Sequence, residues 1–173
     1  MTDPVSDPHR RPDPEALAQA RAILEAARDA VLSVLDPRGW PMVSRIALQM
    51  DAGGQPLAML SDLALHTAAL RADPRAALLV DATVTDSPRG MSLTRARLSL
   101  QVEAHPLPPA EDAALRRAWV ARDPRAQVYA RLGDFRLWRM QPRGGLLNAG
   151  FGRAYRLSEA DLGVGRNGEG SGD

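Results

Sequence analysis

The side chains in this sequence best suited to chemistry are those that could hold a phosphate group. Arginine binds phosphate well because its planar guanidinium donates two parallel hydrogen bonds to phosphate oxygens. Serine and threonine hydroxyls add neutral donors, and free N–H groups at the start of a helix favour an anion. On these grounds the candidates are Arg45, Ser61, His66, Thr67, Arg71 and Arg97.

Two of these candidates have an alternative interpretation. Ser61 follows an expected strand and precedes a helix expected to begin near Leu63. Serine is a preferred residue at the N-cap of a helix, so Ser61 could cap this helix without touching a ligand. His66 could lie on the helix surface or face a phosphate. Residue types alone leave both alternatives open.

Serine hydrolase chemistry is a rival hypothesis because Ser, His and Asp are all present. The sequence has no GxSxG motif, and only His66 and His105 could serve as a base outside the N-terminal tail. GxGxxG and GxxxxGK[ST] loops are also absent. A phosphate must therefore be held by side chains and isolated N–H groups.

Composition excludes several kinds of active site. All 22 basic residues are arginine, and the chain has no cysteine and only three histidines. Lysine Schiff bases, thiol nucleophiles, disulfides and thiolate metal sites are therefore impossible, and we expect no metal site. The net charge is +1, with no basic stripe and no apolar run of about 18 residues. We expect a cytoplasmic protein that binds neither nucleic acid nor membrane.

Hydrophobic periodicity predicts one domain over residues 14–162, between disordered tails at 1–13 and 163–173. Asp13 and Pro14 suit the start of a helix whose apolar spacing continues to Val31. Further helices are predicted over 62–74 and 110–124, with a short one to Tyr129. Strands are predicted over 31–36, 42–51, 56–61, 76–84, 94–104, 135–142 and 144–151.

Strands dominate this order, which predicts an α+β, mainly β fold built on an antiparallel barrel with peripheral helices. The strand at 76–84 is largely apolar, as expected for burial on both faces. The strand at 94–104 alternates strictly between apolar and polar residues. Its polar face, which includes Arg97, is predicted to meet a ligand or a partner.

Aromatic residues are scarce, yet five of the seven fall between Tyr129 and Tyr155. They could stack against a planar ring or form a local core under the barrel, and the sequence favours neither. The five are Tyr129, Phe135, Trp138, Phe151 and Tyr155.

The order of several segments resembles the pyridoxamine 5′-phosphate oxidase-like FMN-binding split barrels, in particular the haem-utilisation branch. The segments are SRIAL, LSDLALHTAALRADPRAALLV, ARLSLQVEA, GDFRLWRMQP and AGFGRAY, and the similarity spans about residues 16–162. The resemblance implies a homodimeric, Greek-key-like split β-barrel. It also implies an FMN groove at the dimer interface and a flavin-dependent oxidoreductase activity.

Matching positions of the family motif implicate seven residues in cofactor binding. They come from the second strand, the end of the third strand, the following helix and the polar face of the 94–104 strand. The seven are Ser44, Arg45, Ile46, Ser61, His66, Thr67 and Arg97. The resemblance thus favours a ligand contact over a helix cap for Ser61. No residue stands out as a catalytic acid or base.

Haem binding on the same barrel is the alternative function. Relatives of the haem-utilisation type use a histidine near the C-terminus and an aspartate that would match Asp134. No histidine follows His105 in this sequence, so haem is less favoured than FMN. Tyr155 is the residue that could replace the missing ligand. The basic residues that hold substrate phosphate in pyridoxamine-phosphate oxidases have no match here, so activity on vitamin B6 is not expected.

Overall fold

The computed structural model describes residues 9–82, 94–150 and 152–163. Phe151, residues 1–8 of the expected N-terminal tail and residues 164–173 of the expected C-terminal tail lie outside this part. No helix in the described ranges is long and apolar enough to cross a membrane.

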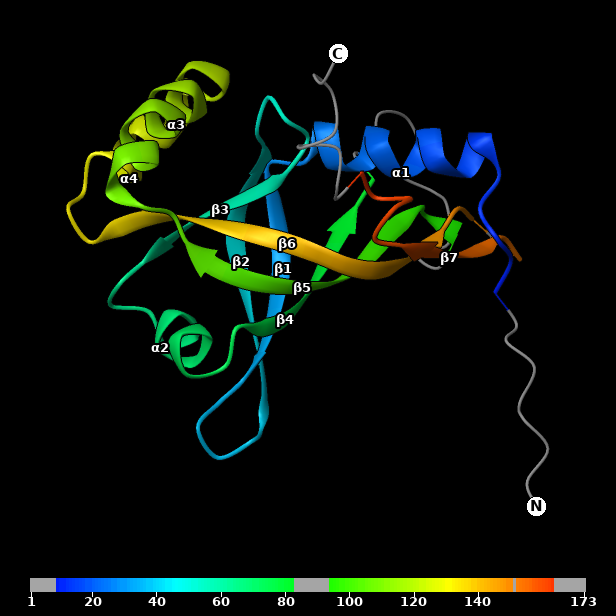
Figure 1. Cartoon of the computed structure of the whole chain (residues 1–173), viewed down its shortest axis with the longest axis horizontal. Helices are drawn as coiled ribbons and strands as arrows, with labels where there is room; N and C mark the ends of the chain where they lie inside the picture. The colour runs from blue at the N-terminus through cyan, green and yellow to red at the C-terminus, as the bar shows by residue number, and fades with distance from the viewer. Residues whose placement is uncertain (1–8, 83–93, 151, 164–173) are drawn as a thin grey trace, which may run out of the picture.

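Seven antiparallel strands make up the sheet, and six of them close into a barrel (Figure 1). Their spatial order is β3-β2-β1-β4-β5-β6-β7, and an additional pairing of β3 with β6 closes the ring. This architecture confirms the predicted mainly β split barrel. The strands are β1 (Asp29–Leu35), β2 (Pro41–Met50), β3 (Pro56–Ser61), β4 (Arg75–Asp81), β5 (Arg97–Pro106), β6 (Phe135–Asn148) and β7 (Ala154–Ser158).

The helices lie around the barrel and do not enter it (Figure 1). Helix α1 (Pro14–Ala26) packs against β2, β4 and β5, whereas α2 (Leu65–Ala72) packs against β1 and β2. Helix α3 (Pro109–Arg122), a 3₁₀ turn (Pro124–Ala126) and α4 (Gln127–Ala130) lie together near the start of β6. Their buried side chains form a second small core with the outward face of β3 and β6.

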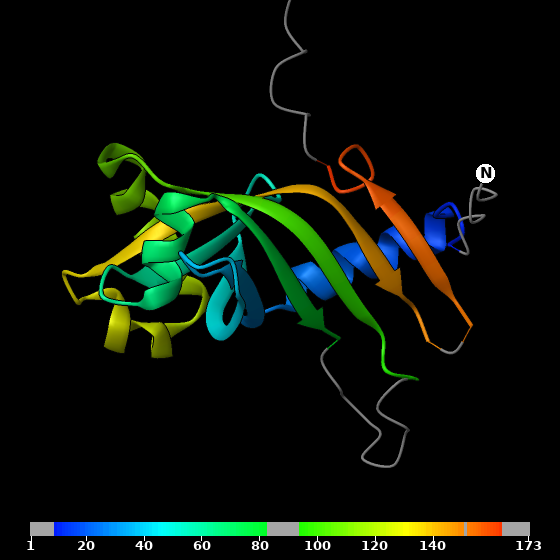
Figure 2. The ribbon, with the colours of Figure 1, turned by 90° about the horizontal axis from the view of Figure 1, so that it is seen from below.

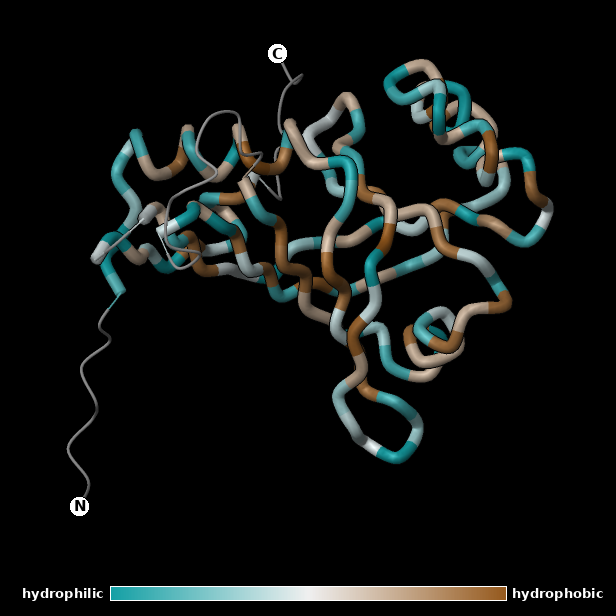
Figure 3. Tube along the Cα trace, turned by 180° about the vertical axis from the view of Figure 1, so that it is seen from behind, coloured by the Kyte–Doolittle hydropathy of each residue, from teal (hydrophilic) through white to brown (hydrophobic). Residues whose placement is uncertain are grey.

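Helix α1 begins as predicted but ends earlier. The carboxylate of Asp13 accepts a hydrogen bond from Ala16 N at 2.8 Å, and Pro14 occupies the first helical position. The apolar spacing that continued to Val31 does not extend the helix, because Val31 belongs to β1 and pairs with Arg45 of β2. The inward residues of α1 join the main core, which fills the barrel. Figure 3 shows the apolar stretches along the strands, with more polar stretches on the helices.

The last strand pair differs from the prediction. The two strands predicted at 135–142 and 144–151 are one continuous strand, β6, which the view in Figure 2 shows as a long curved ribbon. The register of β5 and β6 shifts between Gln101 and Val102, so the backbone of Arg143 has no partner residue on β5. The bulge lies next to Pro142, which has no N–H to donate. Gly145 is needed next to it, since a Cβ there would lie 2.7 Å from Ser99 O.

Neither β7 nor its pairing with the N-terminal segment was predicted from the sequence pattern. Arg10 N donates to Ala154 O and Arg156 N donates to Arg10 O, each at 3.0 Å. Residues 9–13 thus run alongside β7 before α1 begins.

Candidate functional site

One cavity brings together residues from most of the segments that the sequence singled out. It has a volume of about 310 Å³ and lies where β2, β3 and the start of β6 meet α2 and α4. Its lining residues are Arg45, Ile46, Ala47, Met59, Leu60, Ser61, His66, Tyr129 and Phe135. Most of this lining is apolar, with a guanidinium, an imidazole and hydroxyl groups among it, which is typical of a small-molecule site.

Helix α2 places His66 against the barrel. Its Nδ1 lies 3.1 Å from the Ser44 hydroxyl oxygen of β2, and which of the two donates depends on the tautomer. The ring is half-buried, and burial lowers its pKa below the usual 6.5. His66 is therefore mainly neutral near pH 7, so it offers one donor and one acceptor to a ligand.

The lowered pKa of His66 should make the stability of the protein depend on pH. The folded state binds the His66 proton less tightly than the unfolded state does, so protonation favours unfolding as pH falls below about 6.5. The free energy of unfolding of the wild type should therefore decline between about pH 7.5 and about pH 5.5 more steeply than that of His66→Gln. Urea titrations at both pH values measure the difference. Arg117→Gln, an exposed change on α3 that leaves His66 in place, should keep the wild-type slope; equal slopes for wild type and His66→Gln would contradict the assignment.

Ser61 holds the end of β3 to the start of β6. Its hydroxyl donates to Asp134 Oδ2 at 2.5 Å and accepts a hydrogen bond from Leu63 N at 3.1 Å. A second bond joins the same segments, from Asp62 N to Asp134 O at 2.7 Å. Ser61 does not cap α2, because the N-cap residue is Ala64 and no side chain bonds there. Because the Ser61 hydroxyl donates its proton in the bond to Asp134, its oxygen can only accept a hydrogen bond from a ligand.

Thr67 is fully buried behind this turn. Its hydroxyl donates to Ser61 O at 2.7 Å, so it stabilises the link between β3 and α2. It does not line the cavity.

Arg45 extends from β2 at the cavity edge. Its side chain is 73% exposed and its Nη1 lies 2.5 Å from the Asp29 carboxylate of β1. An ion pair this exposed is weak, since water and salt screen it. A ligand phosphate could therefore compete with Asp29 for the guanidinium.

Two aromatic rings form one wall of the cavity. The ring centroids of Tyr129 and Phe135 are 5.7 Å apart with a 36° interplanar angle, and the Tyr129 hydroxyl accepts a hydrogen bond from Trp119 Nε1 at 3.4 Å. The sequence left open whether the aromatic residues form a stack or a core, and the structure divides them. Trp138 and Tyr155 are buried in the main core, away from this wall.

A network of charges that the sequence pattern mostly did not indicate lies beside the cavity. Asp62 accepts from Arg71 at 2.6 Å and from Arg136 at 2.8 Å. Arg71 was a candidate for phosphate binding, but here it pairs with this carboxylate. Asp62 and Arg136 meet because β3 pairs with β6. Segments so far apart in sequence leave no local pattern that could have indicated this ion pair.

The structure thus brings together four of the seven expected cofactor residues in one cavity: Arg45, Ile46, Ser61 and His66. Ser44 touches the site through His66, and Thr67 supports it from behind. Arg97 is not brought to the cavity, because it begins β5 opposite Asp81 and Asn148, where β4 and β1 separate it from β2. Within the described ranges, no group of three or more acidic or histidine side chains could hold a metal ion.

The family model of pyridoxamine 5′-phosphate oxidase matches residues 16–148. Among curated proteins no sequence matches. Among solved structures, one chain is 51% identical, with a TM-score of 0.82 over 88% of this chain and 98% of its own length.

Two longer solved proteins are also similar. A haem-binding protein from Mycobacterium smegmatis is 28% identical with a TM-score of 0.76, over 90% of this chain and 62% of its own. A protein of unknown function from Agrobacterium tumefaciens is 30% identical with a TM-score of 0.74, over 91% of this chain and 65% of its own. The resemblance to this family is thus confirmed, and the similar solved structures include a haem-binding protein. The chain belongs to the pyridoxamine 5′-phosphate oxidase family.

Proposed function

We propose that the protein binds FMN in the cavity between β2, β3, α2 and α4, and acts as a flavin-dependent oxidoreductase. The observation that carries this proposal is the pairing of an apolar, aromatic-walled cavity with an exposed arginine at its edge. A flavin ring is planar and largely apolar, whereas its phosphate is charged, so both features are needed.

The side chains present fit such a cofactor. Ala47 and Met59 offer an apolar surface, and Tyr129 with Phe135 offers a ring wall. Arg45 would hold the phosphate, and His66 with Ser44 would supply further polar contacts. Ser61 would offer an acceptor to the ring system, while Thr67 would keep Ser61 in place. A bound flavin supplies the electron-transfer chemistry, and the protein orients it and limits water access.

We expect a second copy of the chain to cover the cavity. The volume of the cavity is near the lower end for ligand sites, so part of a flavin bound to one protomer would remain exposed. Exposed apolar side chains lie on the β1–β2 hairpin: Trp40 is 69% and Val43 is 68% exposed. The apolar residues of β4 on the outward face, Ala77 and Leu79, are only partly buried, although the sequence predicted burial on both faces. A dimer formed through this face would cover them.

Val43→Asp should therefore convert a dimer to a monomer, because it places a charge in the proposed interface. Sedimentation velocity at micromolar concentration, with FMN present, measures the mass. Ala113→Asp adds the same charge on the exposed side of α3 and should leave the dimer intact. A wild type that sediments as a monomer would refute the proposed assembly.

Haem is the second candidate, and the similarity to the mycobacterial haem-binding protein favours it. Few residues of this sequence could serve as an axial ligand to the haem iron. Tyr155, which the sequence suggested as a replacement ligand, is only 3% exposed because it alternates inward on β7 with Leu157. His66 lies in the proposed flavin site, and His105 is exposed near Glu103.

Separate titrations with FMN and haemin test the two functions. FMN should bind saturably, as followed by quenching of its fluorescence. Haemin should bind weakly, and Tyr155→Phe should leave its Soret band unchanged. A tight, stoichiometric six-coordinate haem spectrum that disappears in His66→Ala or His105→Ala, with no FMN binding, would replace the flavin proposal with the haem one.

A further inference from the structure

A cavity that the proposed flavin site does not use lies between α3 and the turn from β2 to β3, which are neighbours at the top of Figure 1. This α3 cavity has a volume of about 230 Å³ and shares no lining residue with the flavin cavity. Its lining residues are Gln49, Met50, Asp51, Ala52, Leu57, Leu115, Ala118, Trp119 and Arg122.

Strand alternation places Gln49 on the floor of the α3 cavity. Gln49 of β2 pairs with Leu57 of β3, and their neighbours Leu48 and Ala58 point into the barrel core. Since successive side chains point to opposite faces, Gln49 and Leu57 face outward beneath α3. Leu57 packs there in the small core that contains Trp119. An amide group thus lies among apolar side chains.

The amide oxygen of Gln49 has no hydrogen-bond partner in the part of the chain that the structure describes. Gln49 is 3% exposed, and its Nε2 donates to Trp119 O at 3.3 Å. Among the described residues, Trp138 Nε1 is the one fully enclosed side-chain polar atom without a partner. Gln49 Oε1 is therefore not enclosed and reaches the cavity. A molecule that donates a hydrogen bond to it would satisfy a nearly buried acceptor.

The charged groups that line the α3 cavity are engaged elsewhere. Asp51 accepts from Arg139 Nη1 at 3.2 Å. Arg122 donates to Met50 O at 2.9 Å and to Glu25 O. A charged ligand would compete with these bonds, whereas an uncharged donor needs only the oxygen of Gln49.

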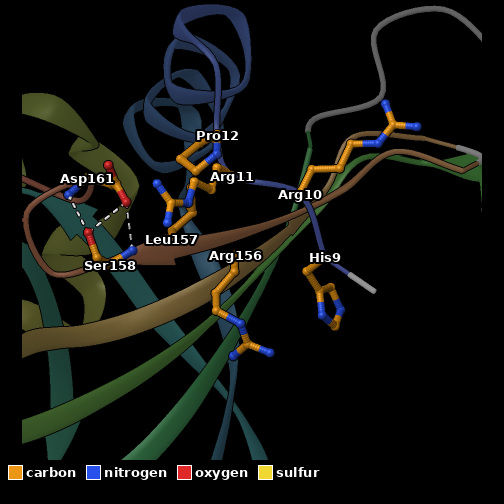
Figure 4. A pocket seen from close by; sticks show the side chains of 8 residues that line it. All are labelled: His9, Arg10, Arg11, Pro12, Arg156, Leu157, Ser158 and Asp161. Carbon is orange, nitrogen blue, oxygen red and sulfur yellow. Dashed lines mark hydrogen bonds between the residues drawn. The ribbon is translucent and has the colours of Figure 1, made fainter. Parts of the chain in front are cut away.

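The cavity between the N-terminal segment and β7 lacks such a sheltered polar group. It is larger, about 600 Å³, and is lined by residues 9–12, residues 156–158 and Asp161. Its three arginines are exposed, and the Asp161 carboxylate accepts hydrogen bonds from Ser158 N and Oγ (Figure 4). Its one buried lining residue, Leu157, is apolar. Shelter from water, not volume, therefore distinguishes the α3 cavity.

We propose that the α3 cavity binds a small uncharged molecule with one aromatic ring and an O–H or N–H donor. A cavity of about 150 Å³ can take up benzene, so a volume of about 230 Å³ holds a ring with small substituents. Leu57, Leu115 and Trp119 offer the ring an apolar and aromatic surface. The donor would bond to Gln49 Oε1.

Titration of the full chain with 4-methylphenol and with toluene tests the proposal. The indole N–H signal of Trp119 in proton–nitrogen correlation spectra follows binding, and the signal of Trp138, inside the barrel, should not move. A purely apolar cavity prefers toluene, because burial of a hydroxyl without a partner costs free energy. The wild type should instead bind 4-methylphenol roughly three- to tenfold more tightly than toluene.

Two variants identify the acceptor and the cavity. Gln49→Met removes the amide but keeps an unbranched side chain, and Trp119 O retains its bond from Asp123 N at 3.1 Å. This variant should weaken 4-methylphenol binding roughly three- to tenfold and change toluene binding by no more than about twofold. Ala47→Leu narrows the flavin cavity and should leave both affinities within about twofold of the wild type. It is needed because Trp119 also bonds to Tyr129 in the flavin cavity wall.

Three results would each overturn the proposal. No saturable shift of the Trp119 signal up to about 5 mM 4-methylphenol would show that the cavity holds only water. Toluene binding as tight as that of 4-methylphenol would show that no donor is recognised, and this comparison uses the wild type alone. An equal loss in Ala47→Leu and Gln49→Met would assign the ligand to the flavin cavity.

Discussion

Replacement of Arg45 by alanine is expected to weaken FMN binding by roughly ten- to a hundredfold and to leave riboflavin binding nearly unchanged. A hydrogen bond to a charged group contributes about 1.5–3 kcal/mol, and Arg45 is the one guanidinium that lines the cavity in the described ranges. Riboflavin lacks the phosphate, so its affinity should not depend on the guanidinium of Arg45. Fluorescence titration of both flavins into wild type and Arg45→Ala gives the four affinities.

The ion pair with Asp29 gives this experiment an internal control. If Asp29 competes with the phosphate for Arg45, Asp29→Asn should tighten FMN binding by roughly two- to fivefold, because an exposed ion pair stabilises by less than about 1 kcal/mol. Arg117→Ala changes the net charge as Arg45→Ala does and should bind FMN like the wild type. Equal affinities for both flavins in wild type and Arg45→Ala would refute the phosphate assignment.

Replacement of Arg116 by alanine is expected to lower the free energy of unfolding by about 3 kcal/mol. Its guanidinium is 24% exposed and connects α3 to two other segments. Nη1 donates to Ala130 O at 2.6 Å and Nη2 donates to Phe135 O at 2.7 Å, while Nε donates to Asp112 at 2.8 Å. Alanine would leave all three acceptors without this donor in a partly buried place.

Asp112 shows how strong this connection is. Burial alone would raise its pKa, yet bonds from Arg116 and from Leu137 N bring the pKa below the usual range. Thermal unfolding should therefore show a decrease in Tm of about 10 °C for Arg116→Ala. The neighbouring Arg117→Ala, on the exposed side of the same helix, should change stability by no more than about 0.5 kcal/mol. Equal stabilities for the two variants would show that the bonds of Arg116 contribute little.

The same variant tests the cavity wall. Arg116 binds the carbonyls of Ala130 and Phe135, and the wall residue Tyr129 precedes Ala130. Arg116→Lys keeps the charge but replaces a planar fork with a point donor, so it should restore only part of the lost stability. If the wall depends on these bonds, FMN affinity should follow the same order: wild type, lysine variant, alanine variant.

Much of the fold could be predicted because its signals are local. The start of α1 depends on Asp13 and Pro14, and β5 depends on an alternation of period two, so a short window of sequence contains the whole cause. The excluded chemistries follow from composition alone. The candidate site could be predicted in part: the family motif pointed to Arg45, Ile46, Ser61 and His66, and the fold places these four in one cavity.

The remaining features were decided by contacts between distant segments. Periodicity could not show that β3 pairs with β6, so it gave no reason to join Ser61 to Asp134 or Asp62 to Arg136. It could not separate the two aromatic residues of the cavity wall from those of the core. Arg97 has the right residue type and strand face, but the strand order places it away from the cavity. The sequence by itself determined which elements form and which side chains they carry, because those causes are local. Only the tertiary structure decided which of these side chains meet, because a contact depends on strand order and register across the whole barrel.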